Sequence, residues 1–175
     1  MRRAGAGVRV ATTIAVTSAA FGVLEARVPQ SRTATLKVSA HVAADCIVTA
    51  TDLRFGDYDP VGIHRTQPLD ATATLSVVCT RGTIAAIDLD DGRTGGRTGA
   101  GTTRAMAGPG NRVLAYDIYR EAARQTRWGR LAGGVSLPAA TSTAARTLDV
   151  YGRVPPNQDV PIGAYADEVL VTIRF

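Results

Sequence analysis

The chain has 175 residues, of which 45% are hydrophobic but only 5% aromatic, and it contains 18 glycines and 8 prolines. This length suits one domain that folds without a metal, and the turn-forming residues favour a β-protein over a helical bundle. The formal charge is +5, yet no run of five or more Lys or Arg residues occurs, which argues against a nucleic-acid-binding protein.

The first residues have the composition of a secretory signal peptide. Two arginines precede a short apolar segment, and small residues then offer cleavage sites after Ala20 or after Ala26. The apolar segment is too short and too rich in Thr and Ser for a membrane anchor, and we expect no membrane span elsewhere. We therefore predict an exported protein with a signal peptide at 1–26 and a mature domain at 27–175. Removal of the signal, with its three arginines and one glutamate, lowers the charge to +3.

Cys46 and Cys79 are the only two cysteines. In a chain exported to an oxidising compartment, such a pair predicts a single disulfide, which stabilises by about 3–4 kcal/mol in the chain-entropy model. A metal site or a catalytic thiol would need further ligands or a partner base. His41 and His64 are the only histidines, and no CxxC spacing occurs, so we predict neither a metal nor another cofactor.

Short apolar segments separated by turn signals predict one β-strand after another and no second domain. The expected strands are residues 36–43 running into Cys46, then 53–58, 71–79, 84–89 and 113–119, a short strand at Trp128, then 148–154 and 165–175. Residues 60–70 are expected to form a polar loop. Residues 92–103, which are rich in Gly, Thr and Arg, are expected to form an exposed, mobile loop. This pattern indicates an antiparallel β-sandwich.

The final stretch shows the clearest alternation. Val169, Val171, Ile173 and Phe175 point to one face of an extended strand, and the residues between them point to the other. We expect this strand to be central in a sheet, with nothing after it to cover its free edge. A β-protein that lacks its last strand needs one from another molecule.

No catalytic or ligand-binding motif is complete. Asp88–Gly92 matches the start of a calcium loop, but the closing position holds a glycine, so a strand end with an Asp-Gly turn is expected. The Gly-rich segment lacks the ending of a phosphate loop, and no nucleophile elbow occurs. The two histidines are expected to be exposed, and Asp167-Glu168 to form a solvated strand entry. We predict that the protein is not an enzyme.

An ordered series of motifs resembles the spore coat protein U domain family, to which the subunits of Csu-type archaic chaperone–usher pili belong. The motifs are Leu53-Arg-Phe-Gly-Asp-Tyr58, Ser76-Val-Val-Cys-Thr-Arg-Gly82, Arg104-Ala-Met106, Leu114-Ala-Tyr-Asp-Ile-Tyr-Arg120, Trp128-Gly129, Val150-Tyr-Gly-Arg-Val-Pro155, Gly163-Ala-Tyr-Ala-Asp167 and Val169-Leu-Val-Thr172, with Cys46 and its preceding strand. The resemblance extends from Thr35 to Phe175.

This resemblance implies an incomplete immunoglobulin-like sandwich that lacks its last strand, with a disulfide between the two cysteines. It implies a pilin subunit whose groove is filled first by a periplasmic chaperone and then, at an outer-membrane usher, by the N-terminal segment of a neighbouring subunit. The expected donor residues are Leu36, Val38, Ala40 and Val42. The expected acceptor groove is lined by Val169, Val171, Ile173 and Phe175. The fibre would lie on the cell surface and serve adhesion and biofilm formation.

Two other functions fit the same sequence. One is a structural coat protein of a spore or cyst, with the same fold but without a fibre. The other is a self-sufficient secreted module that binds a sugar or a protein through its loops, which predicts a stable monomer. Of these three, we expect a shaft or minor pilin subunit, because a tip adhesin of such pili resembles a two-domain protein about twice as long.

Overall fold

The computed structural model describes residues 27–94 and 104–175. The predicted signal peptide and most of the predicted Gly-rich loop lie outside these residues. Within the described part of the chain, no helix is long and apolar enough to span a bilayer. The described residues divide between two units, an N-terminal one that ends at Ala40 and the body, His41–Phe175.

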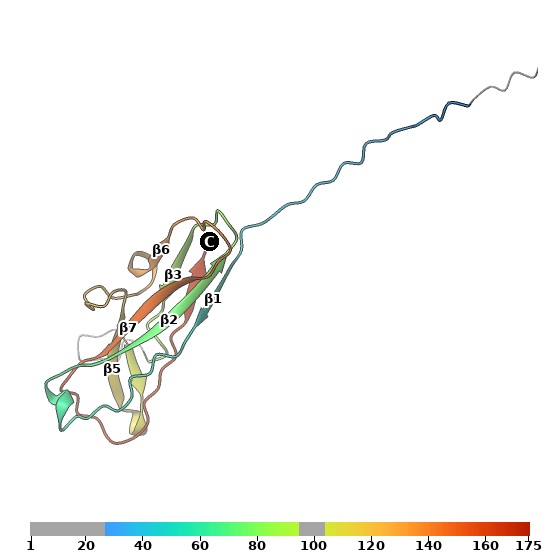
Figure 1. The fold of residues 1–175 in the computed structure, drawn as a ribbon. Coiled ribbons are helices and arrows are strands. Elements are labelled where there is room, and N and C mark those ends of the chain that lie inside the picture. The colour runs from blue at the N-terminus through green and yellow to red at the C-terminus, as the bar shows by residue number, and fades with distance from the viewer. Residues whose placement is uncertain (1–26, 95–103) are drawn as a thin grey trace, which may run out of the picture. The chain divides into compact units, whose positions relative to one another are not determined.

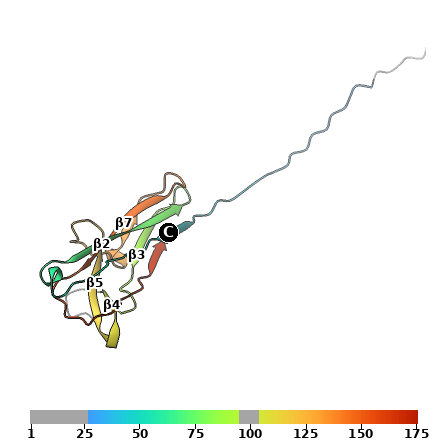
Figure 2. The same ribbon diagram turned by 60° about the horizontal axis from the view of Figure 1, so that its bottom comes forward.

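The body is a sandwich of two antiparallel sheets (Figures 1 and 2). The larger sheet has the strand order β1-β2-β7-β5-β4, and the smaller has the order β6-β3-β8. The strands are β1 (Cys46–Ala50), β2 (Leu69–Cys79), β3 (Ala85–Leu89), β4 (Arg104–Ala107), β5 (Val113–Tyr119), β6 (Val135–Leu137), β7 (Arg146–Val154) and β8 (Val171–Arg174). Among the described residues, three short 3₁₀ helices lie between the strands: η1 (Ile63–Arg65), η2 (Pro109–Asn111) and η3 (Leu131–Gly133).

The core lies between the two sheets and follows the alternation of the sequence. In β2 every second side chain from Ala73 to Cys79 is buried, as expected for a strand with one face on a core. The smaller sheet contributes the buried Ile87 and Leu89. Trp128, the single tryptophan, is 1% exposed, and its indole nitrogen donates to the Ile87 carbonyl oxygen at 3.0 Å. This bond satisfies the one polar group of a large buried ring.

A buried arginine ties β4 to the end of β3. Arg104 is 1% exposed, and its guanidinium donates to the carbonyl oxygens of Asp90 at 2.8 Å and of Trp128 at 2.7 Å. The fully buried Asp117 lies 3.8 Å from it and pairs with Arg127 at 2.7 Å. Burial lowers the pKa of Arg104, and the neighbouring acidic groups oppose this. A buried charge is tolerated here because carbonyls and a carboxylate surround it.

Several predicted strands differ from those observed. Residues 36–43 and 53–58 have the predicted alternation but form no strand, because neither segment has a partner that completes a hydrogen-bonded ladder. The segment at Trp128 makes only an isolated bridge, between Tyr119 and Arg127. The short strands β4 and β6 were not predicted, and β1 begins at Cys46, where the first predicted strand was expected to end. The last strand is confined to β8, which is an edge strand paired only with β3 and not the central strand expected.

Three of the four predicted donor residues, Leu36, Val38 and Ala40, belong to the N-terminal unit, and Val42 is the second residue of the body. Residues 27–40 have no helix or strand and are exposed, and the same is true of the following residues up to Asp45. The larger apolar side chains of this stretch are almost fully open to solvent: Leu36 is 85% exposed, Val38 86% and Val42 78%. We call residues 27–45 the arm.

Candidate functional site: an open apolar groove

The first wall of the groove is the segment that follows β1. Thr51 donates its backbone N–H to the Thr74 carbonyl oxygen at 3.0 Å, and beyond this point the chain leaves β2. Residues 52–58 then make no backbone–backbone hydrogen bond with any described residue. The segment stays in place through its side chains, because Leu53 and Phe55 are half-buried and pack against the core.

A glycine allows this wall to lie close to the larger sheet. A Cβ on Gly152 of β7 would lie 2.7 Å from both Leu53 Cδ2 and Phe55 Cζ. The Phe55 ring also meets Tyr116 of β5 edge to face, with ring centroids 5.9 Å apart. The aromatic and aliphatic side chains of residues 52–58 therefore cover a part of the sheet that has no side chain of its own.

The second wall is the segment that leads into β8. Val160, Tyr165, Val169 and Val171 are half-buried and pack against the core. Ala166 fixes the segment to β4 by two backbone hydrogen bonds with Ala107, of 2.8 and 3.0 Å. These bonds use the backbone groups on one edge of the wall. The backbone groups on its other edge can pair with a further strand.

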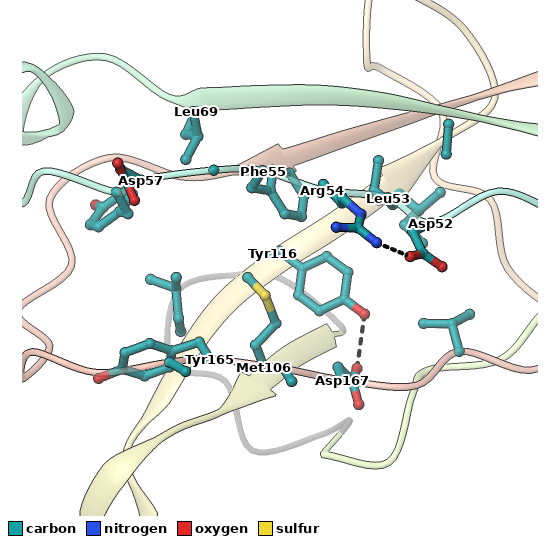
Figure 3. A pocket seen from close by; sticks show the side chains of 18 of the residues that line it. Asp52, Leu53, Arg54, Phe55, Asp57, Leu69, Met106, Tyr116, Tyr165 and Asp167 are labelled. Carbon is teal, nitrogen blue, oxygen red and sulfur yellow. Dashed lines mark hydrogen bonds and ion pairs between the residues drawn. The ribbon is translucent and has the colours of Figure 1, made fainter.

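Between the two walls lies a cavity of about 1100 Å³ (Figure 3). Its floor consists mainly of apolar side chains of the larger sheet, with Leu89 of β3. The floor residues from that sheet are Leu69, Ala73, Leu75, Met106, Leu114, Tyr116, Ile118 and Val150. The floor thus consists of residues of the hydrophobic core, of which Leu69 and Met106 are half-buried and the others are buried.

A polar contact joins the floor of the groove to its second wall. The Tyr116 hydroxyl donates to Asp167 Oδ2 at 2.8 Å, as Figure 3 shows. Asp167 Oδ1 also accepts the backbone N–H of Arg93 at 2.9 Å, and Arg93 forms an ion pair with Glu168. Burial, and next the bond to Asp167, raise the pKa of Tyr116 far above the usual range, so that the phenol stays protonated and donates. Asp167 therefore anchors the second wall to β5 and to the turn after β3.

The structure brings together only part of the predicted acceptor set. Val169 and Val171 line the groove. Ile173 lies further along β8, where it is half-buried and faces Ile87, and Phe175 is 56% exposed. The residues of 52–58 and the floor strands were not predicted to take part. The signal in the sequence for the first wall is the apolar alternation of 53–58, which equally fits an ordinary paired strand.

Cys46 and Cys79 form the predicted disulfide, with a Cα–Cα distance of 4.1 Å. They are directly opposite each other in register, at the first residue of β1 and the last of β2. His64, expected to be exposed, is instead 8% exposed, stacks on Tyr58 and has Nδ1 3.1 Å from the Gln67 carbonyl oxygen. This histidine is a packed core residue of the 60–70 loop.

The carboxylates that were considered as ligands have structural partners. Asp90 Oδ1 accepts the N–H of Gly92 at 3.0 Å, which makes the predicted Asp-Gly turn, and that of Leu170 at 2.9 Å. Asp88 pairs with Arg174 at 2.8 Å. In the described part of the chain, no group of three or more acidic, His or Cys side chains is placed to hold a metal. Asp167 is half-buried and accepts a hydrogen bond from Tyr116, so it is not the solvated residue that was expected.

Comparison with known proteins gives three consistent findings. A family model described as the Spore Coat Protein U domain matches residues 32–172. The chain is 35% identical over 174 residues to "Protein U" of Myxococcus xanthus, covering 94% of this chain and 95% of the relative. It is also similar to a chain in the crystal structure of the CsuC-CsuE chaperone–tip adhesion subunit pre-assembly complex, from archaic chaperone–usher Csu pili of Acinetobacter baumannii.

The structural similarity has a TM-score of 0.54 and 25% sequence identity, and it covers 77% of this chain but only 40% of that chain. The all-β body with two antiparallel sheets is thus an immunoglobulin-like sandwich that lacks its last strand, as the resemblance implied. The family consists of structural pilin and coat proteins and is not enzymatic. On the agreement of family model, relative and fold, this chain belongs to the Spore Coat Protein U domain family.

Proposed function

We propose that the protein is an exported subunit that polymerises by donor-strand complementation into a surface fibre for adhesion and biofilm formation. The observation that carries this proposal is the groove. Two walls, 51–58 and 160–171, flank an apolar floor, and the described structure has no β-pairing between them. The arm supplies the complementary element, because in an extended strand Leu36, Val38, Ala40 and Val42 all lie on one face, which is then apolar.

The energetics support an exchange between molecules. Burying the apolar side chains of one donor contributes about 1.5–3 kcal/mol for each large residue, or roughly 6–10 kcal/mol for the set. This is comparable with the whole stability of a typical domain, about 5–15 kcal/mol. A subunit whose groove is empty is therefore expected to be marginally stable and to aggregate through its open edges, and a donor strand would correct both.

The proposal includes the partners that such an exchange needs. A periplasmic chaperone would fill the groove after residues 1–26 have been removed as a signal peptide, and an outer-membrane usher would then present the arm of a neighbouring subunit. The similarity to a chain of a chaperone–subunit complex supports the chaperone. Because the chain has an arm of its own to donate, we propose a shaft or minor subunit.

The test compares two sets of substitutions in the arm. The inward set replaces Leu36, Val38, Ala40 and Val42 with serine, and the outward set replaces Thr33 and Thr35 with serine and Ser39 with alanine, which leaves the charges of the arm unchanged. Each variant is expressed in the periplasm with and without a candidate pilus chaperone, and size-exclusion chromatography follows the assemblies. The inward set is expected to bind the chaperone but to form no fibres, whereas the outward set polymerises. Normal fibres from the inward set, or from a deletion of residues 27–42, would refute the donor assignment.

A second candidate is a coat protein of a spore or cyst, laid down without a fibre. The 35% identity to "Protein U", over nearly the full length of both chains, favours it specifically. The two functions differ in the machinery they require. Genes for a chaperone and an usher beside this one indicate a fibre, and their absence, with the protein found in the surface layer of the spore, indicates a coat.

A further inference from the structure

The charged residues that line the groove are mainly acidic. Among the described residues they are three carboxylates, Asp52, Asp57 and Asp167, and one guanidinium, Arg54. Figure 3 shows the first two and Arg54 on one wall and Asp167 on the other. Asp52 and Arg54 are paired at 2.6 Å, so that their charges largely cancel. Asp57 is exposed and forms no ion pair with a described residue. The rim therefore keeps a net negative charge.

The arm has the opposite charge. It contains Arg27, Arg32 and Lys37, together with His41, against a single acidic residue, Asp45, at its end next to Cys46. All of these residues are exposed. In an extended strand the side chain of Lys37 points away from Leu36 and Val38. When the apolar face of an arm enters the groove, Lys37 therefore points outward, toward the rim formed by Asp52, Asp57 and Asp167.

We propose, on the basis of the donor-strand function above, that the acidic rim selects the basic arm of a second copy of this chain. The occupant of the groove in the assembled state is then the same protein, and the chain forms a homopolymer. Opposite charges on the two partners accelerate the encounter, and an arm with acidic residues at these positions is repelled. The apolar floor gives the affinity, and the rim gives the choice of partner.

The test measures binding of a fluorescent peptide of residues 27–42 to the full chain by stopped-flow anisotropy, at about 10 mM and about 1 M salt, where the screening length falls from roughly 30 Å to roughly 3 Å. The association rate constant is expected to fall at least about tenfold with salt. The change Lys37→Glu in the peptide is expected to slow association at low salt, and Asp57→Lys in the chain to restore the rate with that peptide.

Two controls separate rim charge from total charge. Asp149→Lys changes the net charge of the chain equally but lies on β7 outside the groove, and it is expected to leave the rate nearly unchanged. A scrambled peptide of the same composition is expected not to bind. Binding of the native peptide that is insensitive to salt and to both charge reversals would overturn the rim proposal and leave the groove as an acceptor. Failure of the native peptide to bind at any salt concentration would overturn the donor-strand function itself.

Discussion

Val171 is the residue of β8 at which the groove is tested most directly. It is half-buried, lies opposite Leu89 in register and lines the cavity. The change Val171→Asn removes apolar burial worth about 1 kcal/mol for a half-buried valine, and it desolvates an amide at about 1–3 kcal/mol. We expect the free energy of unfolding to fall by about 2–4 kcal/mol. In the donor-filled state the residue becomes fully buried, so the affinity for the arm peptide should fall further.

Thr172→Asn is the matched control, because the next residue of the same strand is exposed on the opposite face. It is expected to cost less than about 1 kcal/mol, the full span of strand propensity. Denaturant unfolding followed by fluorescence provides the assay, since Trp128 is the single tryptophan and is 1% exposed. Equal losses of stability and of peptide affinity in the two variants would refute the assignment of Val171 to the groove.

Three further changes test other parts of the body. Replacing Cys46 and Cys79 together with serine should lower the free energy of unfolding by about 3–4 kcal/mol, measured by denaturant titration. Gly152→Val should displace the leucine and the phenylalanine that cover this glycine and weaken binding of the arm peptide, measured by anisotropy. The hydrogen bond from Arg153 lowers the pKa of Asp70 in the folded state, so this pair stabilises fully above the pKa of an unfolded aspartate. That stability is lost as pH falls through the lower folded value, and Arg153→Gln should reduce the dependence in acid unfolding curves, with Arg124, 3.4 Å from Asp70, retaining the rest.

Each of these three predictions has an outcome that would contradict it. A free energy of unfolding unchanged by loss of the disulfide would mean that the pairing of β1 with β2 does not depend on it. Peptide affinity unchanged in the glycine variant would mean that the first wall plays no part in binding. For the pH prediction, Arg54→Gln is the control, because it alters an exposed pair with Asp52 whose side chains are 83% and 74% exposed. An acid unfolding curve that shifts equally in both arginine variants would rule out a specific role for the Asp70 pair.

The sequence predicted which faces are buried better than which segments pair. Alternation located the inward residues of β2 and β8, because a side chain's face depends only on its position along an extended chain. The same alternation in 36–43 and 53–58 gave no strand, because a ladder depends on a neighbour that the pattern does not specify. The Tyr116–Asp167 contact and the burial of Arg104 depend on partners distant in sequence, so no local motif could indicate them.

The disulfide stands where the arm enters the body. Tension applied through the arm reaches the sandwich at Cys46 and passes at once through a covalent bond into the last residue of β2. From there nine residue pairs distribute the pull along β7, the partner of β2 in the middle of the sheet. The edge strand β1 is therefore not pulled away from β2 residue by residue. The first wall of the groove, which follows β1, keeps its position under tension.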